Sequence, residues 1–274
     1  MPDKLKMSAE LSRLVVLIRG GGEVASGVAH KLARARFRVC LTETSQPLAV
    51  SRGVAFCEAI YDGEKEVEGI VARRVESAAE IHKLWREGRI PIVVDPKKSV
   101  KKILKPGVMV DAIMAKKNLG TRIGDAPLVI GLGPGFRAGK DVHLVVETNN
   151  SERLGRVILE GEAEKDTGIP VAIGGLTLER ALHSSGGGLF QTDKEIGELV
   201  SAGDMIASVG GQPVKAEIDG IIRALLRSGT AVKKGTKLGE IDPSGDKEAC
   251  YTIRPRMRAI AGGVLEAIMM RYNV

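Results

Sequence analysis

A glycine-rich segment near the start of the chain has the residue types and spacing of a phosphate-binding loop. Gly20, Gly22 and Ala25 fit the pattern G-x-G-x-x-A. In this pattern the first glycine permits a tight turn, the second lets a phosphate approach the backbone, and the small third residue allows a helix to pack closely on a strand. The amide groups that begin such a helix face the anion. We therefore expect a phosphate-bearing ligand to contact Gly20, Gly21, Gly22, Ala25, Ser26 and Gly27.

The segments on either side of this loop supply the elements that it requires. An apolar run over residues 14–18 predicts a strand that is buried on both faces. Apolar residues recur at helical spacing over residues 24–32, and residues 38–42 predict a second short strand. Glu43 ends this strand, where a carboxylate can accept hydrogen bonds from ribose hydroxyls. The segment therefore predicts a βαβ unit that holds a nucleotide.

Two interpretations of this unit stay open. It can bind a nucleotide or dinucleotide, or its glycines can serve packing alone in a Rossmann-like lobe. Glu23 lies beside the expected phosphate and would repel it, although Arg19 can offset this charge.

A second glycine-rich loop follows an apolar strand predicted over residues 128–132. Gly133 and Gly135 can form a backbone nest for an anion, with Arg137 or Lys140 as the counter-charge. Loops that follow parallel strands line the ligand crevice of an α/β sheet. The alternative is a tight turn between two strands.

Other polar residues give weaker signals. Asp95, Asp111 and Lys116 lie at or near predicted strand ends, so they can bind a metal or act as acid and base, or they can cap turns. The cysteines and histidines have no metal-ligand spacing, and we expect no metal site. An odd number of cysteines, namely Cys40, Cys57 and Cys250, favours a reducing, cytoplasmic environment.

Composition limits the partners that we expect. The net charge is +7, and the positive excess lies within residues 1–150. Aromatic residues make up only 3% of the chain, too few for the stacking platforms of single-strand nucleic-acid binders. No apolar run is long enough to span a bilayer. We expect a phosphate-bearing small molecule as the ligand, and neither a nucleic acid nor a membrane as a partner.

The alternation of predicted strands and helices indicates an α/β fold in two domains. Residues 1–150 predict a Rossmann-like parallel sheet that binds a nucleotide or cofactor. Residues 151–274 contain an internal repeat, Val200–Val209 and Val232–Ile241, that predicts two hairpins in a smaller β-rich domain, followed by a C-terminal helix. The repeat resembles the barrel-sandwich fold of biotinyl and lipoyl carrier domains. The turn at Gly210–Pro213 lacks the carrier lysine, so we expect no carrier role.

Three runs of residues resemble a known family. They are Ile18–Gly27, Val129–Phe136 and Val146–Asn149, and the similarity extends to residues 259–266. These runs resemble the selenium-dependent molybdenum hydroxylase accessory family. The resemblance implies a cytoplasmic maturation factor, related in role to xanthine dehydrogenase accessory factors, with molybdenum cofactor as ligand and a molybdenum hydroxylase subunit as partner. It implies no catalytic residue, and it makes Gly133, Gly135 and Phe136 expected ligand contacts.

The leading hypothesis is an accessory or maturation factor for a molybdenum hydroxylase. It would bind a phosphate-bearing cofactor or nucleotide, either molybdenum cofactor or a dinucleotide, and assist its insertion or modification. One alternative is an NAD(P)-dependent redox enzyme, for which Gly20, Gly22 and Glu43 are the evidence. Another is a non-catalytic scaffold that docks a hydroxylase subunit. Whether the protein is an enzyme stays open.

Overall fold

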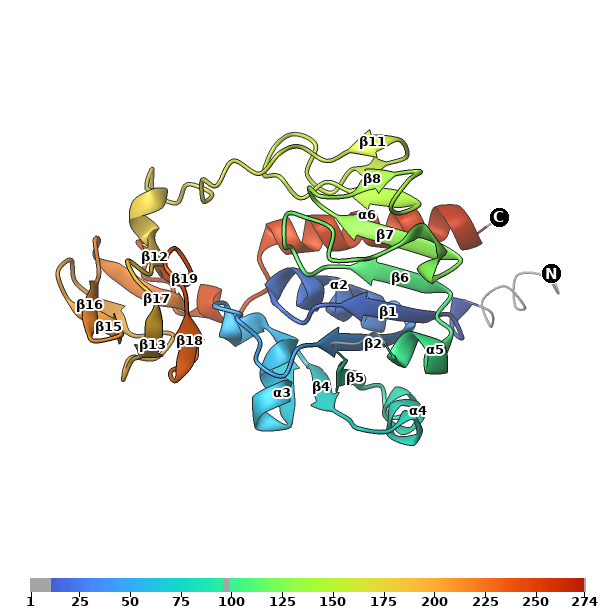
Figure 1. Cartoon of the computed structure of the whole chain (residues 1–274), viewed down its shortest axis with the longest axis horizontal. Coiled ribbons are helices and arrows are strands. Elements are labelled where there is room, and N and C mark those ends of the chain that lie inside the picture. The colour runs from blue at the N-terminus through green and yellow to red at the C-terminus, as the bar shows by residue number, and fades with distance from the viewer. Residues whose placement is uncertain (1–10, 96–98, 274) are drawn as a thin grey trace. The chain divides into compact units, whose positions relative to one another are not determined.

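The computed structural model describes residues 11–95 and 99–273 (Figure 1). The chain divides into two units. Unit 1 contains the residues up to Pro47, residues 56–166 and the residues from Ile253 onward, and unit 2 contains residues 48–55 and 167–252. Residue 150, where we expected a boundary, lies inside the middle segment of unit 1.

A nine-stranded sheet forms the centre of unit 1, in the order β10-β9-β7-β6-β1-β2-β5-β4-β3 (Figure 1). The strands from β9 to β4 in this order are parallel, and β3 and β10 pair antiparallel at the two edges. The bounds are β1 Val15–Arg19, β2 Arg38–Glu43, β3 Glu64–Val67, β4 Ile70–Arg74, β5 Ile90–Val94, β6 Val108–Asp111, β7 Leu128–Leu132, β9 Leu144–Val146 and β10 Val157–Ile158. A separate two-stranded sheet pairs β8 Arg137–Ala138 with β11 Gly161–Glu162.

Apolar side chains on the strands bury against helices. Leu17, Cys40 and Met109 share a buried cluster with Ile81 and Leu84 of α4. Helix α2 packs against the C-terminal helix α6, so the chain returns to unit 1 after it has formed unit 2. The α-helices of unit 1 are α2 Glu23–Arg34, α3 Ala59–Asp62, α4 Ala78–Arg86, α5 Val100–Leu104 and α6 Pro255–Tyr272, with 3-10 turns η2 Phe56–Glu58 and η3 Ile123–Asp125.

Unit 2 is built from two four-stranded sheets, β12-β19-β17-β14 and β16-β15-β13-β18. Between their faces lies a core of apolar side chains that includes Phe190, Ile222 and Leu238. Its strands are β12 Ala181–His183, β13 Gly188–Gln191, β14 Leu199–Val200, β15 Met205–Val209, β16 Gln212–Lys215, β17 Gly220–Leu225, β18 Thr230–Val232 and β19 Lys237–Asp242, and its 3-10 turns are η1 Arg52–Val54, η4 Leu178–Arg180 and η5 Glu248–Cys250.

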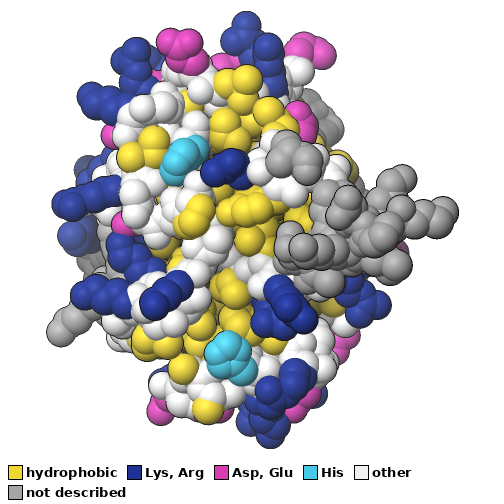
Figure 2. All heavy atoms as spheres, turned by 90° about the vertical axis from the view of Figure 1, so that its right-hand side faces the viewer, with side chains coloured by type: hydrophobic (Ala, Val, Ile, Leu, Met, Phe, Trp, Pro, Cys, Tyr) yellow, Lys and Arg dark blue, Asp and Glu magenta, His cyan; other side chains and the backbone are white. Residues whose placement is uncertain are grey.

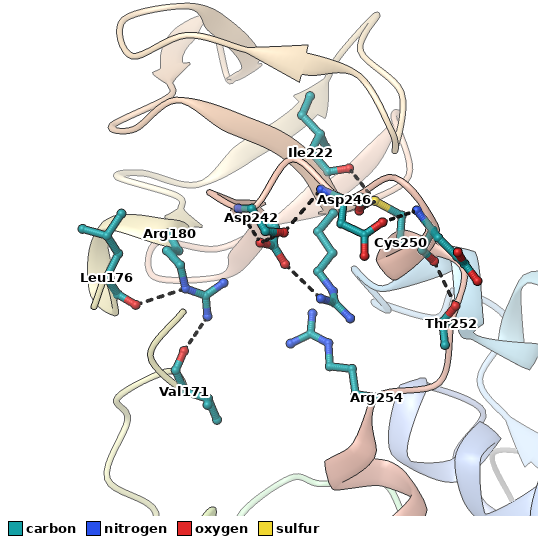
Figure 3. A network of polar contacts seen from close by, with 12 residues as sticks. Val171, Leu176, Arg180, Ile222, Asp242, Asp246, Cys250, Thr252 and Arg254 are labelled. Carbon is teal, nitrogen blue, oxygen red and sulfur yellow. Dashed lines mark hydrogen bonds and ion pairs between the residues drawn. The ribbon is translucent and has the colours of Figure 1, made fainter. Parts of the chain in front are cut away.

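Several buried polar groups of unit 2 form hydrogen bonds with neighbouring residues of the same unit (Figure 3). The guanidinium group of Arg180, a residue only 1% exposed, donates from Nη2 to the carbonyl oxygen of Val171 at 2.7 Å. Asp242 accepts from Arg223 Nη1 at 2.9 Å and from Ser244 Oγ at 2.7 Å. Burial alone would raise the pKa of Asp242, but the bonds from Ser244 and Arg223 lower it overall. The ion pair between Arg223 and Asp242 links β17 to the end of β19.

The predicted fold class is wrong. The structure is α/β with a large mixed sheet, and a Rossmann-like parallel sheet followed by a biotinyl-like barrel-sandwich domain is not shown. The edge strands are antiparallel because each pairs with the strand next to it in the sequence, β3 with β4 and β10 with β9. The two-residue turn Glu68-Gly69, in which both φ angles are positive, connects β3 to β4.

The predicted hairpins of the repeat are also wrong. Gly203 and Gly235 do adopt positive φ angles, 93° and 80°, as the repeat predicted. However, the two strands of each copy enter different sheets: β14 and β15 separate, and so do β18 and β19. The glycine turns therefore pass the chain from one sheet to the other.

Candidate functional site

The loop between β1 and α2 lies at the carboxyl edge of the large sheet. Gly20 has a φ angle of 100°, and its N–H donates to the carbonyl oxygen of Thr42 at 2.8 Å. A Cβ atom at this position would approach the carbonyl oxygen of Ala112 to 2.9 Å. Only glycine adopts such a conformation readily in so little space, which explains the first glycine of the motif.

Glu43 is anchored to the same loop. Its Oε2 accepts from the N–H of Gly21 at 2.8 Å, and its Oε1 accepts from the N–H of Thr44 at 2.7 Å. A carboxylate offers about four acceptor positions, so these two bonds orient the group and leave positions for a further donor. The side chain is only partly buried. The structure thus brings Glu43 beside the glycine loop, as the spacing predicted.

The start of α2 is open. Gly22 is the N-cap residue, and no described side chain caps the helix there. A Cβ atom on Gly22 would meet no atom within 4 Å. The amides that begin an α-helix have no partner within the helix, and they carry a partial positive charge.

The charge of Glu23 is balanced from an unexpected direction. Arg254 Nε lies 3.0 Å from Glu23 Oε1, whereas Arg19, the expected partner, binds Asp111. Both Glu23 and Arg254 belong to unit 1. Sequence reasoning missed Arg254, because nothing in the local pattern links residues so far apart in the chain. The repulsion that we expected between Glu23 and a phosphate is therefore reduced.

The other three residues of the first motif lie beneath the loop. Ala25 and Ser26 are fully buried. Ser26 Oγ donates to the carbonyl oxygen of Gly21 at 3.1 Å and accepts from the N–H of Phe56 at 2.8 Å. At Gly27 a Cβ atom would lie 2.9 Å from Met257 Cβ, so this glycine permits α2 and α6 to meet. These residues hold the loop in place.

The second glycine loop lies at the same edge of the sheet, but a chain segment separates it from the first. Strand β6 lies between β1 and β7, and the residues that follow β6 contact both loops. At Gly135 a Cβ atom would lie 2.6 Å from the Cα of Lys117. Gly133 donates its N–H to the carbonyl oxygen of Val146 at 2.9 Å, and Phe136 is 6% exposed in the core. The positions of Gly133, Gly135 and Phe136 are thus explained by packing.

Asp95, Asp111 and Lys116 do not form an acid–base group. Asp95 caps α5, accepting from the N–H groups of Ser99 at 2.7 Å and Val100 at 2.9 Å. Lys116 pairs with Asp166.

Asp111 belongs to a buried structural cluster. It accepts from Arg19 Nη1 at 2.7 Å and from Thr121 Oγ1 at 2.6 Å. Within the described part of the chain, no group of three or more His, Cys, Asp or Glu side chains is placed to hold a metal ion.

Glu147 is a buried carboxylate whose role the sequence did not reveal. Its Oε1 accepts from the N–H groups of Thr148 and Asn149, each at 2.7 Å, and its Oε2 accepts from the N–H of Glu164 at 2.7 Å. Three backbone bonds satisfy this group, so it shapes the end of β9 and is not available for catalysis.

Comparisons with known proteins give one relative of high identity. The uncharacterized protein YqeB of Escherichia coli K12 is 46% identical over 266 residues, which cover 97% of this chain and 49% of that protein. The chain therefore spans about half the length of the curated relative that it matches. A search of protein-family models found no match.

Similar solved structures share little sequence with this chain. The ectoine utilization protein EutE of Ruegeria pomeroyi, with product bound, is 14% identical with a TM-score of 0.26, covering 84% of this chain and 85% of that one. A succinylglutamate desuccinylase of Silicibacter sp. TM1040 is 14% identical with a TM-score of 0.24, covering 84% of each chain. TM-scores this low give no argument for assigning the activity of these proteins to this chain.

The comparisons contradict the expected membership of the selenium-dependent molybdenum hydroxylase accessory family. None of the proteins named by these comparisons is such an accessory factor: the curated relative is uncharacterized, and the solved structures are of an ectoine utilization protein, a succinylglutamate desuccinylase and an aspartoacylase family protein. The predicted role as a maturation factor for such a hydroxylase, with its dependence on selenium and its use of molybdenum cofactor, is therefore wrong. Among the described residues, no helix is long and apolar enough to cross a bilayer.

Proposed function

We propose that unit 1 binds a phosphate-bearing small molecule at the carboxyl edge of its sheet. In this proposal the phosphate lies at the start of α2, and a hydroxyl-bearing part such as a ribose lies at Glu43. The observation that supports it most directly is the open, uncapped helix start at Gly22 beside a carboxylate already oriented by Gly21.

The electrostatics of this helix start favour an anion. Helix α2 has 12 residues, and its aligned peptide groups place about half a positive charge at its N-terminus. Within residues 11–95 and 99–273 no side chain caps this helix start, so a phosphate oxygen can accept hydrogen bonds from the first-turn amides. Arg254 balances the nearby Glu23. The ligand would replace the missing cap.

Glu43 supports the choice of a hydroxyl-bearing ligand. The bonds from Gly21 and Thr44 fix the carboxylate before any ligand arrives, so little side-chain freedom is lost on binding. Its remaining acceptor positions suit two neighbouring hydroxyl groups. A phosphate and a vicinal diol at this spacing in a βαβ unit describe a nucleotide.

A pair of substitutions at Gly22 tests the phosphate contact. Gly22→Asp places a carboxylate in the open cap position, whereas Gly22→Asn places a side chain of the same size without charge. Both residues are good N-caps, and the φ angle of −71° accepts either, so we expect the melting temperature to stay constant or rise slightly. Isothermal titration calorimetry with ADP and NAD measures binding.

We expect Gly22→Asp to weaken binding of the nucleotide at least about tenfold more than Gly22→Asn does, because only the former adds like charge. Glu43→Ala should weaken the binding of ADP and leave that of inorganic pyrophosphate within about twofold, because pyrophosphate has no ribose. Equal affinities in the Asp and Asn variants, or no binding of either nucleotide by the unaltered chain, would contradict the proposal.

The cysteines support a second, coarser proposal about location. Cys40, Cys57 and Cys250 are buried thiols rather than disulfides. Burial raises the pKa of Cys40 well above its usual range, so this thiol stays protonated and unreactive. A reducing compartment such as the cytoplasm suits this arrangement.

A further inference from the structure

A second basic hollow lies in unit 1, at the amino edge of the large sheet. It is a cavity of about 730 Å³, bounded by the ends of α2 and α4 and the beginnings of β2, β4 and β5. The candidate site described above lies at the carboxyl edge of the same strands. Figure 2 shows the face that lies on the right-hand side of Figure 1, and on this face Lys and Arg side chains lie around apolar surface.

The side chains that line this cavity have one sign of charge. No Asp or Glu is among its described lining residues. Its arginines are Arg34, Arg36, Arg38, Arg86 and Arg89, and its aromatic side chains are Phe37, His82 and Trp85.

The fold balances only part of this charge. Helices α2 and α4 both end at the cavity in Schellman turns, in which Phe37 donates its N–H to Leu32 and Arg89 donates its N–H to Leu84. Each helix end contributes about half a negative charge. Arg89 also pairs with Glu64 at 2.9 Å. About three positive charges remain without an ion-pair partner among the described residues, which is more than stabilisation of two helix ends requires.

Arg36 lines the cavity in a backbone conformation that residues other than glycine rarely adopt. Its φ angle is 69°, in the left-handed region, at the position after the α2 C-cap where glycine is usual. A non-glycine residue is strained in this region because its Cβ atom crowds the backbone. Such strain is found at functional sites more often than elsewhere, and here it brings a guanidinium group to the cavity.

Trp85 gives the cavity a rigid wall and leaves little room for stacking. Its Nε1–H donates to the carbonyl oxygen of Val39 at 2.7 Å. The guanidinium of Arg38 lies 6.0 Å from the centre of its ring, and the ring of His82 meets it edge-on at 5.2 Å. Arg38 therefore lies over one face of the indole, and the guanidinium groups are the main hydrogen-bond donors that the cavity offers to a ligand.

We propose that this cavity binds an oligophosphate, a short chain of linked phosphate groups on a small molecule or alone. A guanidinium group can donate two parallel hydrogen bonds to the oxygens of one phosphate. Several arginines around one cavity therefore suit a ligand with several phosphates better than a ligand with a single phosphate. A hollow also suits a compact anion better than the extended basic stripe that tracks a nucleic-acid backbone. This site is separate from the one at Gly22, and it does not depend on it.

The test uses the full chain and inorganic tripolyphosphate, followed by isothermal titration calorimetry in about 0.1 M salt, where charge screening is moderate. Arg36→Gly removes one guanidinium and relieves the left-handed backbone. Lys105→Gly is its matched control: Lys105 also has a positive φ angle, 44°, at the C-cap of a helix, and it lies outside the cavity. Both variants lose one charge and gain a glycine where glycine is favoured.

We expect Arg36→Gly to weaken binding of tripolyphosphate about tenfold while its melting temperature holds or rises. Lys105→Gly should bind within about twofold of the unaltered chain. Gly22→Asp removes the phosphate contact proposed at α2, so tripolyphosphate binding that remains in this variant belongs to the cavity, and we expect it to fall about tenfold when Arg36→Gly is added. Failure of the nucleotide proposal is thereby distinguishable from failure of this one. ATP that binds as tightly as tripolyphosphate would support recognition of the phosphate chain, and tighter binding of ATP would support a nucleotide as its source.

Three outcomes would overturn the proposal. The unaltered chain does not bind tripolyphosphate, or Lys105→Gly weakens binding as much as Arg36→Gly does, or Gly22→Asp abolishes it. Binding of single-stranded RNA in the absence of any tripolyphosphate binding would likewise overturn it, since the cavity would then be part of a nucleic-acid surface.

Discussion

Asp111 and Arg19 show how a residue that suggests chemistry can serve stability instead. Their side chains are 2% and 11% exposed, and they lie 2.7 Å apart. Thr121 Oγ1 and the N–H of Ile113 also donate to the Asp111 carboxylate. These three donors hold the carboxylate in one orientation. It fixes the chain that leaves β6, and this chain forms one wall of the Gly20 loop.

Removal of Asp111 should therefore cost much stability. Asp111→Ala leaves the guanidinium of Arg19 largely buried without its partner, and we expect a loss of about 3–5 kcal/mol in the free energy of unfolding. Asp166→Ala breaks the Lys116 pair, whose side chains are 60% and 41% exposed, and should cost less than about 1 kcal/mol. Urea denaturation measures both. Similar losses in the two variants would show that burial of the Arg19 pair has little effect.

At the scale of elements, the contact between α2 and α6 positions residues of the candidate site. Gly27 on α2 faces Met257 at the start of α6, with no room for a Cβ atom between them. The same contact brings the α6 N-terminus, and with it Arg254, to Glu23. Gly27 therefore acts on the site through a helix from the other end of the chain.

Two glycine-to-alanine substitutions should separate packing from helix propensity. Gly27→Ala places its Cβ 2.9 Å from Met257 Cβ and should destabilise the protein by about 1–3 kcal/mol. Gly262→Ala, on α6, meets only the flexible end of Lys31 at 3.8 Å and should stabilise it by up to about 1 kcal/mol, because alanine favours the helix. Thermal unfolding followed by circular dichroism compares the two. If both changes had the same sign, the close helix contact would be disproved.

The elements that the sequence predicts are those with strong local signals. Strand β7 has the predicted bounds, Leu128–Leu132, because a continuous apolar run needs no partner to be recognised. Strand β3, Glu64–Val67, consists mostly of charged residues and is stabilised by its pairing with β4. Its sequence therefore has no apolar pattern that predicts a strand. The repeat showed where the chain turns in unit 2 and could not show which sheet each strand joins, since that depends on distant partners.

The same limit applies to the candidate site. Gly20, Gly22 and Glu43 follow from spacing within one βαβ unit, and the structure brings them together. Arg254 and the segment after β6 reach the site through tertiary packing, which a single sequence does not encode as a motif. The arginine cavity is lined by residues from five elements, so no local sequence pattern predicts it.

At the scale of the whole molecule, Glu68 links the hairpin of β3 and β4 to the returning C-terminal segment. It accepts from Arg258 Nη2 at 2.7 Å and from the N–H of Ile253 at 2.8 Å. Burial alone would raise the pKa of Glu68, but these bonds lower it overall. A carboxylate with a lowered pKa stabilises the fold at neutral pH, and this contribution is lost as the pH falls below about 4.3 through the lowered value.

Glu68→Gln should therefore change the acid response of the protein. We expect the variant to be less stable than the unaltered chain at pH 7, and the difference to shrink between about pH 5 and pH 3, because protonation removes the same charge from the unaltered chain. Glu66→Gln, on the exposed part of β3, is the control and should leave the difference small at every pH. Urea midpoints across the pH range measure this. A difference that does not vary with pH would refute the role of the Glu68 charge.

The return of the chain to unit 1 has a consequence for biosynthesis. A ribosome releases residues 167–252 before it releases α6, so the β-rich unit can acquire its structure while the large sheet still lacks the helix that packs on α2. Until α6 emerges, the apolar face of α2 around Gly27 stays uncovered during translation. Nascent chains stalled just before Pro255 should accordingly be the ones that chaperones hold longest.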